Sequence, residues 1–170
     1  MNFPIFRDRI NIEMRKVRVR VIVLLITSAL SAAVLFSSCA SLRFEQKEED
    51  VLTVVSLINK GEAETLSRLS QTPFLFDREI LMLEKDTKTV WKNLTDAGFS
   101  LKQPAVVKIE PVSEESYKSF SDGMEIEVYF EKYVPETAKI AHVETEGGPC
   151  LFILNDKQDG YPMILGMKVW

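Results

Sequence analysis

Apolar residues recur at helical spacing in the stretch that follows residue 48. The first set lies three or four positions apart, which places its members on one face of a helix: Val51, Val54, Val55 and Ile58. Gly61 is placed to end this helix. A second, shorter helix is predicted from the apolar spacing of Ala63, Leu66 and Leu69.

A third helix is predicted after a break at residues 73–83. The break contains Pro73 and reads as a short strand, a turn and a second strand. Asp86 is a suitable N-cap for the helix that follows, and Gly98 is placed to close it. The apolar face of this helix is predicted to consist of Val90, Trp91, Leu94 and Ala97.

After Pro104 the apolar period changes to two, which predicts strands with one buried and one wet face. The inward positions of the first strand are Ala105, Val107 and Ile109, and those of a second are Met124, Ile126, Val128 and Phe130. Residues 112–123, between them, are predicted to be a loop or a short exposed helix. Three further strands are expected at 138–144, 150–154 and 163–170, separated by the turn signals Gly147-Gly148 and Asp159-Gly160.

The N-terminal part has a different pattern, an uncharged run from Val21 to Phe36 that follows a basic stretch. Two small residues, Ser37 and Ser38, come next and stand directly before Cys39. This layout of a positive region, an apolar region and small residues is typical of a secretory signal. An uncleaved membrane anchor is the alternative, because the uncharged stretch could extend to Leu42 and so reach about 20 residues.

The string Phe36-Ser37-Ser38-Cys39-Ala40 resembles the lipobox of bacterial lipoproteins, in the relaxed form found in spirochaetes. Only the aromatic Phe36 departs from the consensus. The resemblance implies that residues 1–38 are a signal peptide and that Cys39 becomes the lipidated first residue of the mature protein. It implies a membrane-anchored lipoprotein of the cell envelope, at the periplasmic or outer-membrane face. We interpret Met14 as the true start.

Removal of the signal would leave an acidic protein. The chain has 21 basic and 25 acidic residues, and residues 1–38 hold six basic and two acidic ones, so the remainder has 15 and 23, a net charge of about −8. Such a balance argues against nucleic acid as a partner, since phosphate binding needs a basic surface. It also argues against adsorption to anionic lipid, so the acyl chains on Cys39 are expected to provide the membrane attachment.

Cysteine and histidine content limits the chemistry further. If Cys39 is lipidated, Cys150 has no disulfide partner, and in its apolar surroundings we expect it to be a small buried hydrophobic residue. His142 is the only histidine of the chain, so no histidine pair or Cys/His cluster is present to suggest a metal. No phosphate-binding loop is found, and no cofactor is indicated.

Residues 48–170 resemble the NTF2-like (cystatin-like α+β) cone fold in their predicted order of two helices, a hairpin, a third helix and then strands. The local segments Asn59-Lys60-Gly61-Glu62-Ala63 and Pro73-Phe74-Leu75-Phe76-Asp77 also look similar. The resemblance implies an α+β domain in which N-terminal helices pack on a curved antiparallel sheet, after a tether at 39–47. One predicted strand is in excess, so either residues 138–144 continue their predecessor or the fold differs.

Enzymes of this fold place an Asp, His or Tyr inside an apolar cone, which singles out Asp77, His142 and Tyr129 as candidates. For Asp77 we favour the role of a turn residue that caps local backbone, and for His142 that of a hydrogen-bonded core or edge residue. An acidic strand face is expected at Glu125, Glu127 and Glu131. Trp91 and Trp170 are both expected in the core. No catalytic residue is assigned.

Two classes of function therefore remain. The favoured one is a lipid-anchored, non-enzymatic binding or assembly module that holds an envelope protein. The other is an NTF2-like small-molecule-binding protein or enzyme that uses an apolar cone pocket for a small apolar ligand. An enclosed cavity in which His142 and a carboxylate converge would favour the second class, and a filled cone would favour the first.

Overall fold

The structure, a computed structural model, describes residues 47–170. Its first helix spans residues 47–59 and buries the predicted face of Val51, Val54, Val55 and Ile58. Gly61 follows with a φ of 68°, a left-handed conformation that glycine adopts without strain, and so ends this helix as predicted. Within the described residues, no helix is both long and apolar enough to cross a membrane.

The next elements follow the predicted order, with α2 (Ala63–Leu69), β1 (Ser70–Phe76), β2 (Glu79–Leu81) and α3 (Glu84–Asp96). The predicted N-cap of α3 is wrong. Leu83 occupies the cap position. Asp86 lies in the first turn, where its negative charge interacts favourably with the helix dipole and stabilises the helix. On the predicted face Trp91 is buried, whereas Ala97 is exposed beyond the end of the helix.

Six strands form one open, mixed sheet in the order β2-β1-β6-β5-β4-β3. The remaining strands are β3 (Ala105–Pro111), β4 (Lys139–Thr145), β5 (Gly148–Gln158) and β6 (Tyr161–Val169). The predicted turns join β4 to β5 and β5 to β6, and Asp159 and Gly160 both have positive φ angles in the second. The α+β class is confirmed, but the sheet is not wholly antiparallel, because β1 and β6 pair in parallel.

The predicted strand at residues 124–131 is wrong. This segment forms helix α4 (Met124–Tyr133), preceded by a short 3-10 helix, η1 (Ser116–Ser119). Its buried residues Ile126, Tyr129 and Phe130 have the three- and four-residue spacing of a helix face. The three glutamates expected on a strand face therefore belong to this helix. Because this segment is a helix, four strands follow α3 instead of the five that were predicted.

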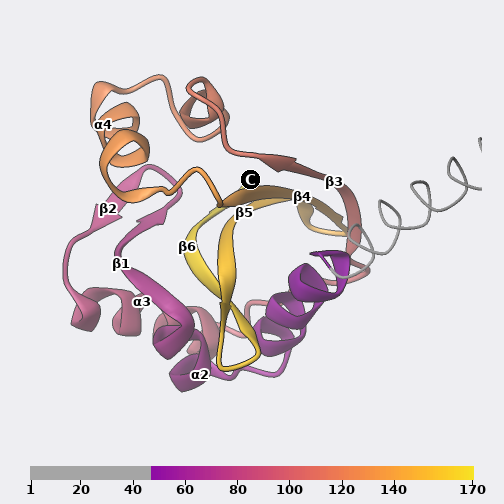
Figure 1. Ribbon diagram of the computed structural model, residues 1–170. Coiled ribbons are helices and arrows are strands. Elements are labelled where there is room, and N and C mark those ends of the chain that lie inside the picture. Colours follow the sequence, from indigo (N-terminus) through magenta and orange to yellow (C-terminus); the bar gives the residue numbers. More distant parts are fainter. Residues whose placement is uncertain (1–46) are drawn as a thin grey trace, which may run out of the picture. The chain divides into compact units, whose positions relative to one another are not determined.

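The sheet is covered on both faces, so the expectation of one wet face is also wrong. The first helix, α2 and α3 pack on one face, where Trp91, Phe152 and Met167 belong to one buried cluster. On the other face α4 and the segment around Phe120 cover Leu75, Ile153 and Leu165. Figure 1 shows these two layers, with α2 and α3 on one side of the strands and α4 on the other.

Edge strand β3 does not keep the predicted alternation. Val106 and Ile109 pack against the buried cluster, while Ala105 is exposed and Val107 is 61% exposed. The pairing register with β4 shifts between Val106 and Lys108, which moves the inward position by one residue.

A second irregularity lies in β6, where the register with β5 shifts between Ile164 and Gly166. Gly166 lies so close to β1 that a Cβ atom there would be 2.9 Å from the Leu75 carbonyl oxygen. Only glycine fits this contact, and Leu165 is the additional residue of the bulge.

Candidate functional site

The candidate residues fall in four different parts of the chain. Cys39, the predicted lipidation site, lies outside the described residues. Asp77 lies in the turn between β1 and β2, Tyr129 on α4 and His142 on β4. Each of the last three is held by its own set of partners, and no two of them contact each other through a described hydrogen bond.

Asp77 holds the backbone where β1 ends against β6. Its Oδ1 accepts a hydrogen bond from the Val169 N–H at 2.9 Å, and its own N–H donates to the Met167 carbonyl at 2.8 Å. Its φ of 53° is left-handed, a conformation that Asp tolerates better than most residues. Asp77 is thus a turn residue that caps backbone, as favoured from the sequence, but the capped N–H is 92 positions away and not local.

Tyr129 fastens α4 to the bulge of β6. Its hydroxyl donates to the Leu165 carbonyl at 2.7 Å and lies 3.2 Å from the Pro73 carbonyl. The bulge leaves Leu165 without a register partner in β5, and the hydroxyl supplies a donor to its carbonyl. Burial raises the pKa of this hydroxyl, which leaves it protonated at neutral pH. Tyr129 is a structural residue here.

His142 belongs to a small charged cluster on edge strands β3 and β4. Its Nε2 lies 2.8 Å from Glu110 Oε1, while Lys108 Nζ lies 2.6 Å from Glu110 Oε2. An ionised carboxylate only accepts, so Nε2 carries the proton. The hydrogen bond from Lys108, followed by that from His142, lowers the pKa of Glu110 despite its partial burial. Ile140 and His142 are two positions apart on β4 and so lie on the same face of the sheet. Ile140 belongs to the buried cluster beneath α4, so His142 is directed away from the three N-terminal helices.

The space between these three helices and the sheet is filled by large side chains. Trp91 is buried, with its ring centroid 5.9 Å from that of Phe74. Its indole Nε1–H donates to Ser70 Oγ at 2.8 Å, and that hydroxyl in turn donates to the Leu66 carbonyl at 2.8 Å. This space is therefore occupied mainly by hydrophobic side chains, with the Ser70 hydroxyl as a polar partner of Trp91.

Cys150 is buried in this same cluster. Burial, followed by the negative charge of Asp77, raises the pKa of its thiol to about 12. Thiolate is the nucleophilic form of cysteine, so Cys150 is unreactive at neutral pH. This agrees with the buried hydrophobic role predicted for it.

Trp170, by contrast, is 59% exposed, and the prediction that it belongs to the core is wrong. Its ring centroid lies 4.3 Å from Lys168 Nζ. That ammonium donates to the Ser119 and Phe120 carbonyls, at 2.8 and 2.9 Å. Burial, followed by the nearby charge of Arg78, lowers the pKa of Lys168. Because its donors serve these contacts, Lys168 joins β6 to the end of η1.

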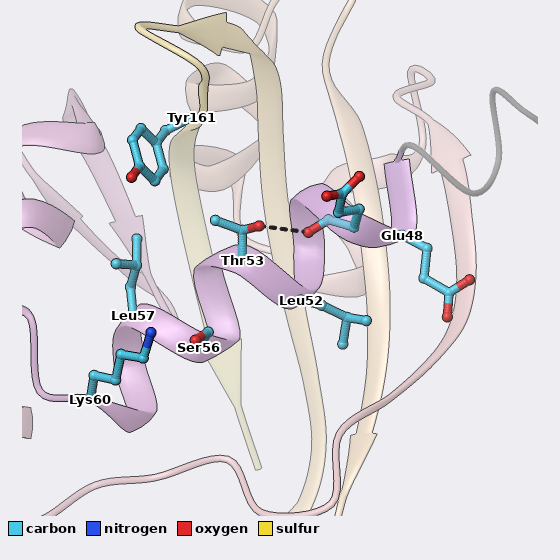
Figure 2. Close-up of a pocket in the computed structure, with 8 residues that line it drawn as sticks. Glu48, Leu52, Thr53, Ser56, Leu57, Lys60 and Tyr161 are labelled. Carbon is cyan, nitrogen blue, oxygen red and sulfur yellow. Dashed lines mark hydrogen bonds between the residues drawn. The ribbon is translucent and has the colours of Figure 1, made fainter.

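An apolar depression of the described surface lies along the first helix. This groove has a volume of about 570 Å³ and is open to solvent. Figure 2 shows Tyr161, from the start of β6, across from the helix that carries Thr53, Leu57 and Lys60. The full lining is Glu48, Glu49, Leu52, Thr53, Ser56, Leu57, Lys60 and Tyr161.

The helical spacing of the first helix indicates its buried face and does not reveal this groove. Leu52, an apolar residue that lies off the buried face, is a sequence signal for it. Tyr161 could not be connected with it, because more than one hundred residues separate the two and only the pairing of β5 with β6 brings them near each other.

Within residues 47–170 no three His, Cys, Asp or Glu side chains are grouped closely enough to hold a metal ion. Comparison with known proteins gave no assignment either: no protein-family model, curated protein or solved structure matches the chain.

Proposed function

We propose that the protein is a lipid-anchored lipoprotein of the bacterial cell envelope whose domain binds or assembles with another envelope protein and performs no catalysis. The anchor rests on the sequence around Cys39. The binding role rests on the way in which the candidate acid–base residues are used in the folded domain.

The observation that carries the proposal is the separation of these residues from one another and their use in hydrogen bonds within the domain. Asp77 caps β6, Tyr129 secures α4, and His142 pairs with Glu110 on the sheet face away from the first three helices. General acid–base catalysis needs such groups within hydrogen-bond reach of one substrate. Their partners here are instead parts of the domain itself.

We also propose that the domain is a variant of the NTF2-like cone. Two helices, a hairpin, a third helix and four further strands follow one another in the order that the sequence resemblance implies. The η1–α4 segment is then an addition that covers the outer face of the sheet. In this variant the cone interior is occupied by Trp91, Phe74 and Phe152, which supports a partner-binding role over a small-molecule pocket.

The test is capture of partners by the full chain in its own membranes. Cells that produce a tagged chain are treated with a short cross-linker, and the proteins recovered are quantified against those recovered with an unrelated lipoprotein. We expect one or a few proteins to be strongly enriched. A Cys39→Ala variant, in which processing and acylation are blocked, should remain a longer precursor and recover less of them.

The enzyme class is tested in the same cells with His142→Gln and Asp77→Asn. Both substitutions keep a group that can hydrogen-bond to the present partners but remove the acid–base function. Unchanged partner recovery and cell phenotype are expected. Loss of the phenotype by either variant, with a native melting curve, would favour an enzyme, and recovery of no enriched protein would contradict the binding role.

A further inference from the structure

The groove along the first helix has the make-up of a peptide-binding surface. Its helix residues form adjacent pairs that recur every four positions from 48 to 60, so they form one stripe that rises by about 18 Å. Tyr161 faces this stripe from β6 (Figure 2). An open channel of this length accepts a helix of about three turns or a short extended segment.

Large apolar side chains are exposed in this groove. Leu52 is 37% exposed and Tyr161 is 39% exposed, whereas Leu57 packs partly against the buried cluster. A tyrosine presents a wide apolar surface at a low cost in conformational entropy, which suits it to protein contacts. The groove thus offers an aromatic and an aliphatic contact to one ligand.

The two walls are held in a fixed relation. Asp50 on the first helix pairs with Lys157 on β5 at 2.6 Å, and β5 carries β6 and hence Tyr161. The Thr53 hydroxyl is bonded to the Glu49 carbonyl at 2.8 Å. A groove that is formed before binding loses little entropy when a ligand enters.

Charge differs between the two ends of the groove. Glu48 and Glu49 lie at one end, and no ion pair to either is found among the described residues, in contrast to the neighbouring Asp50. Lys60 lies at the other end. A bound segment would therefore gain from a basic residue beside the two glutamates.

We propose that this groove binds a short segment of a partner protein, with apolar side chains placed between Leu52 and Tyr161 and a Lys or Arg beside Glu48 and Glu49. This inference rests on the proposed binding function and assigns it a site. An anionic lipid surface is disfavoured by the acidic end, and a second copy by the net charge of about −8 beyond residue 38. The openness of the groove disfavours a small molecule, which needs most of its surface buried.

The test uses the full chain in nanodiscs of neutral lipid and a displayed library of random peptides of roughly 12 residues, a length that covers the stripe. Binders to empty nanodiscs are removed first. Enriched peptides should carry Lys or Arg next to apolar residues. Their affinity for a Glu48→Lys/Glu49→Lys variant should be about tenfold lower or more at low salt, and high salt should weaken binding to the wild type.

Matched controls come from other parts of the surface. Glu125→Lys/Glu131→Lys on α4 changes the net charge by the same amount and should leave binding unchanged. Leu52→Gln should weaken binding several-fold, whereas Leu83→Gln, at another exposed apolar residue, should not. Melting curves establish that each variant is folded.

Three results would overturn the inference. Absence of enriched peptides would do so, as would equal loss of binding in the α4 and groove variants. If membrane capture yields a partner whose recovery is unaffected by the groove variants, the binding function stands and this site is wrong.

Discussion

The Asp77 carboxylate shows how individual polar side chains are used in this domain. It accepts a hydrogen bond from the Val169 N–H, 92 positions further along the chain, at the place where the parallel pair of strands ends. A carboxylate occupied in this way stabilises the native backbone and is poorly placed to abstract a proton from a ligand. The same reasoning applies to the Glu110 carboxylate, which accepts from Lys108 and from His142.

The Glu110 cluster predicts a pH dependence of stability. The pKa of Glu110 in the folded state lies below its ordinary value of 4.5, so the cluster contributes fully above pH 4.5 and is lost as the pH falls through the lower, folded value. Partial exposure limits the contribution to less than about 1 kcal/mol. In urea unfolding below pH 4.5, Glu110→Gln should therefore lose less stability on acidification than the wild type.

Glu131→Gln, at an exposed position of α4, is the control for that series and should follow the wild type. If Glu110→Gln also follows the wild type at every pH, the contacts with Lys108 and His142 do not contribute to folding.

The buried thiol gives a second prediction at this scale. Because the pKa of Cys150 is raised to about 12, this thiol of the native protein should not react with a thiol reagent such as dithiobis(nitrobenzoic acid) at neutral pH. After unfolding, the Cys150 thiol should react. Rapid reaction of Cys150 in the native state would contradict its burial.

At the scale of elements, α4 shows why a two-residue alternation was misleading. Met124, Ile126, Val128 and Phe130 alternate with polar residues, yet Ile126, Tyr129 and Phe130 also have helical spacing. A short segment can satisfy both periods. Distant residues select the helix, because Leu75, Ile153 and Leu165 form an apolar sheet face that α4 covers.

Helix α3 should depend strongly on Trp91. Trp91→Ala removes a buried indole, its contact with Phe74 and its hydrogen bond to Ser70, and we expect a loss of about 3–5 kcal/mol in the free energy of unfolding. Trp91→Phe keeps an aromatic ring and should cost less. An unchanged melting temperature for Trp91→Ala, with loss of partner binding, would mean that Trp91 acts at a surface.

Helix α4 should depend on the Tyr129 hydroxyl. Tyr129→Phe leaves the Leu165 carbonyl without this donor, and burial of an unsatisfied carbonyl costs about 1–3 kcal/mol. Tyr133→Phe, at an exposed position of the same helix, should have little effect. Equal stabilities of the two variants in chemical denaturation would show that the hydrogen bond does not hold α4 in place.

For the whole molecule, the sequence supported the order of the first three helices, the hairpin turns and the α+β class, because these depend on local spacing and on residues such as Gly61 and Asp159-Gly160. It could not predict the second cover of the sheet or the groove at Tyr161. Both depend on contacts between segments that are distant along the chain. The parallel pairing of β1 with β6 was missed for the same reason.

The central claim is that a partner-binding domain is attached to a membrane through Cys39. Intact-mass analysis of the full-length gene product, purified from membranes in detergent, tests the attachment most directly. We predict a chain that begins at Cys39 and carries the added mass of its acyl groups, with residues 1–38 removed. Membrane-associated protein that has an unmodified Cys39, or that retains residues 1–38, would contradict the account.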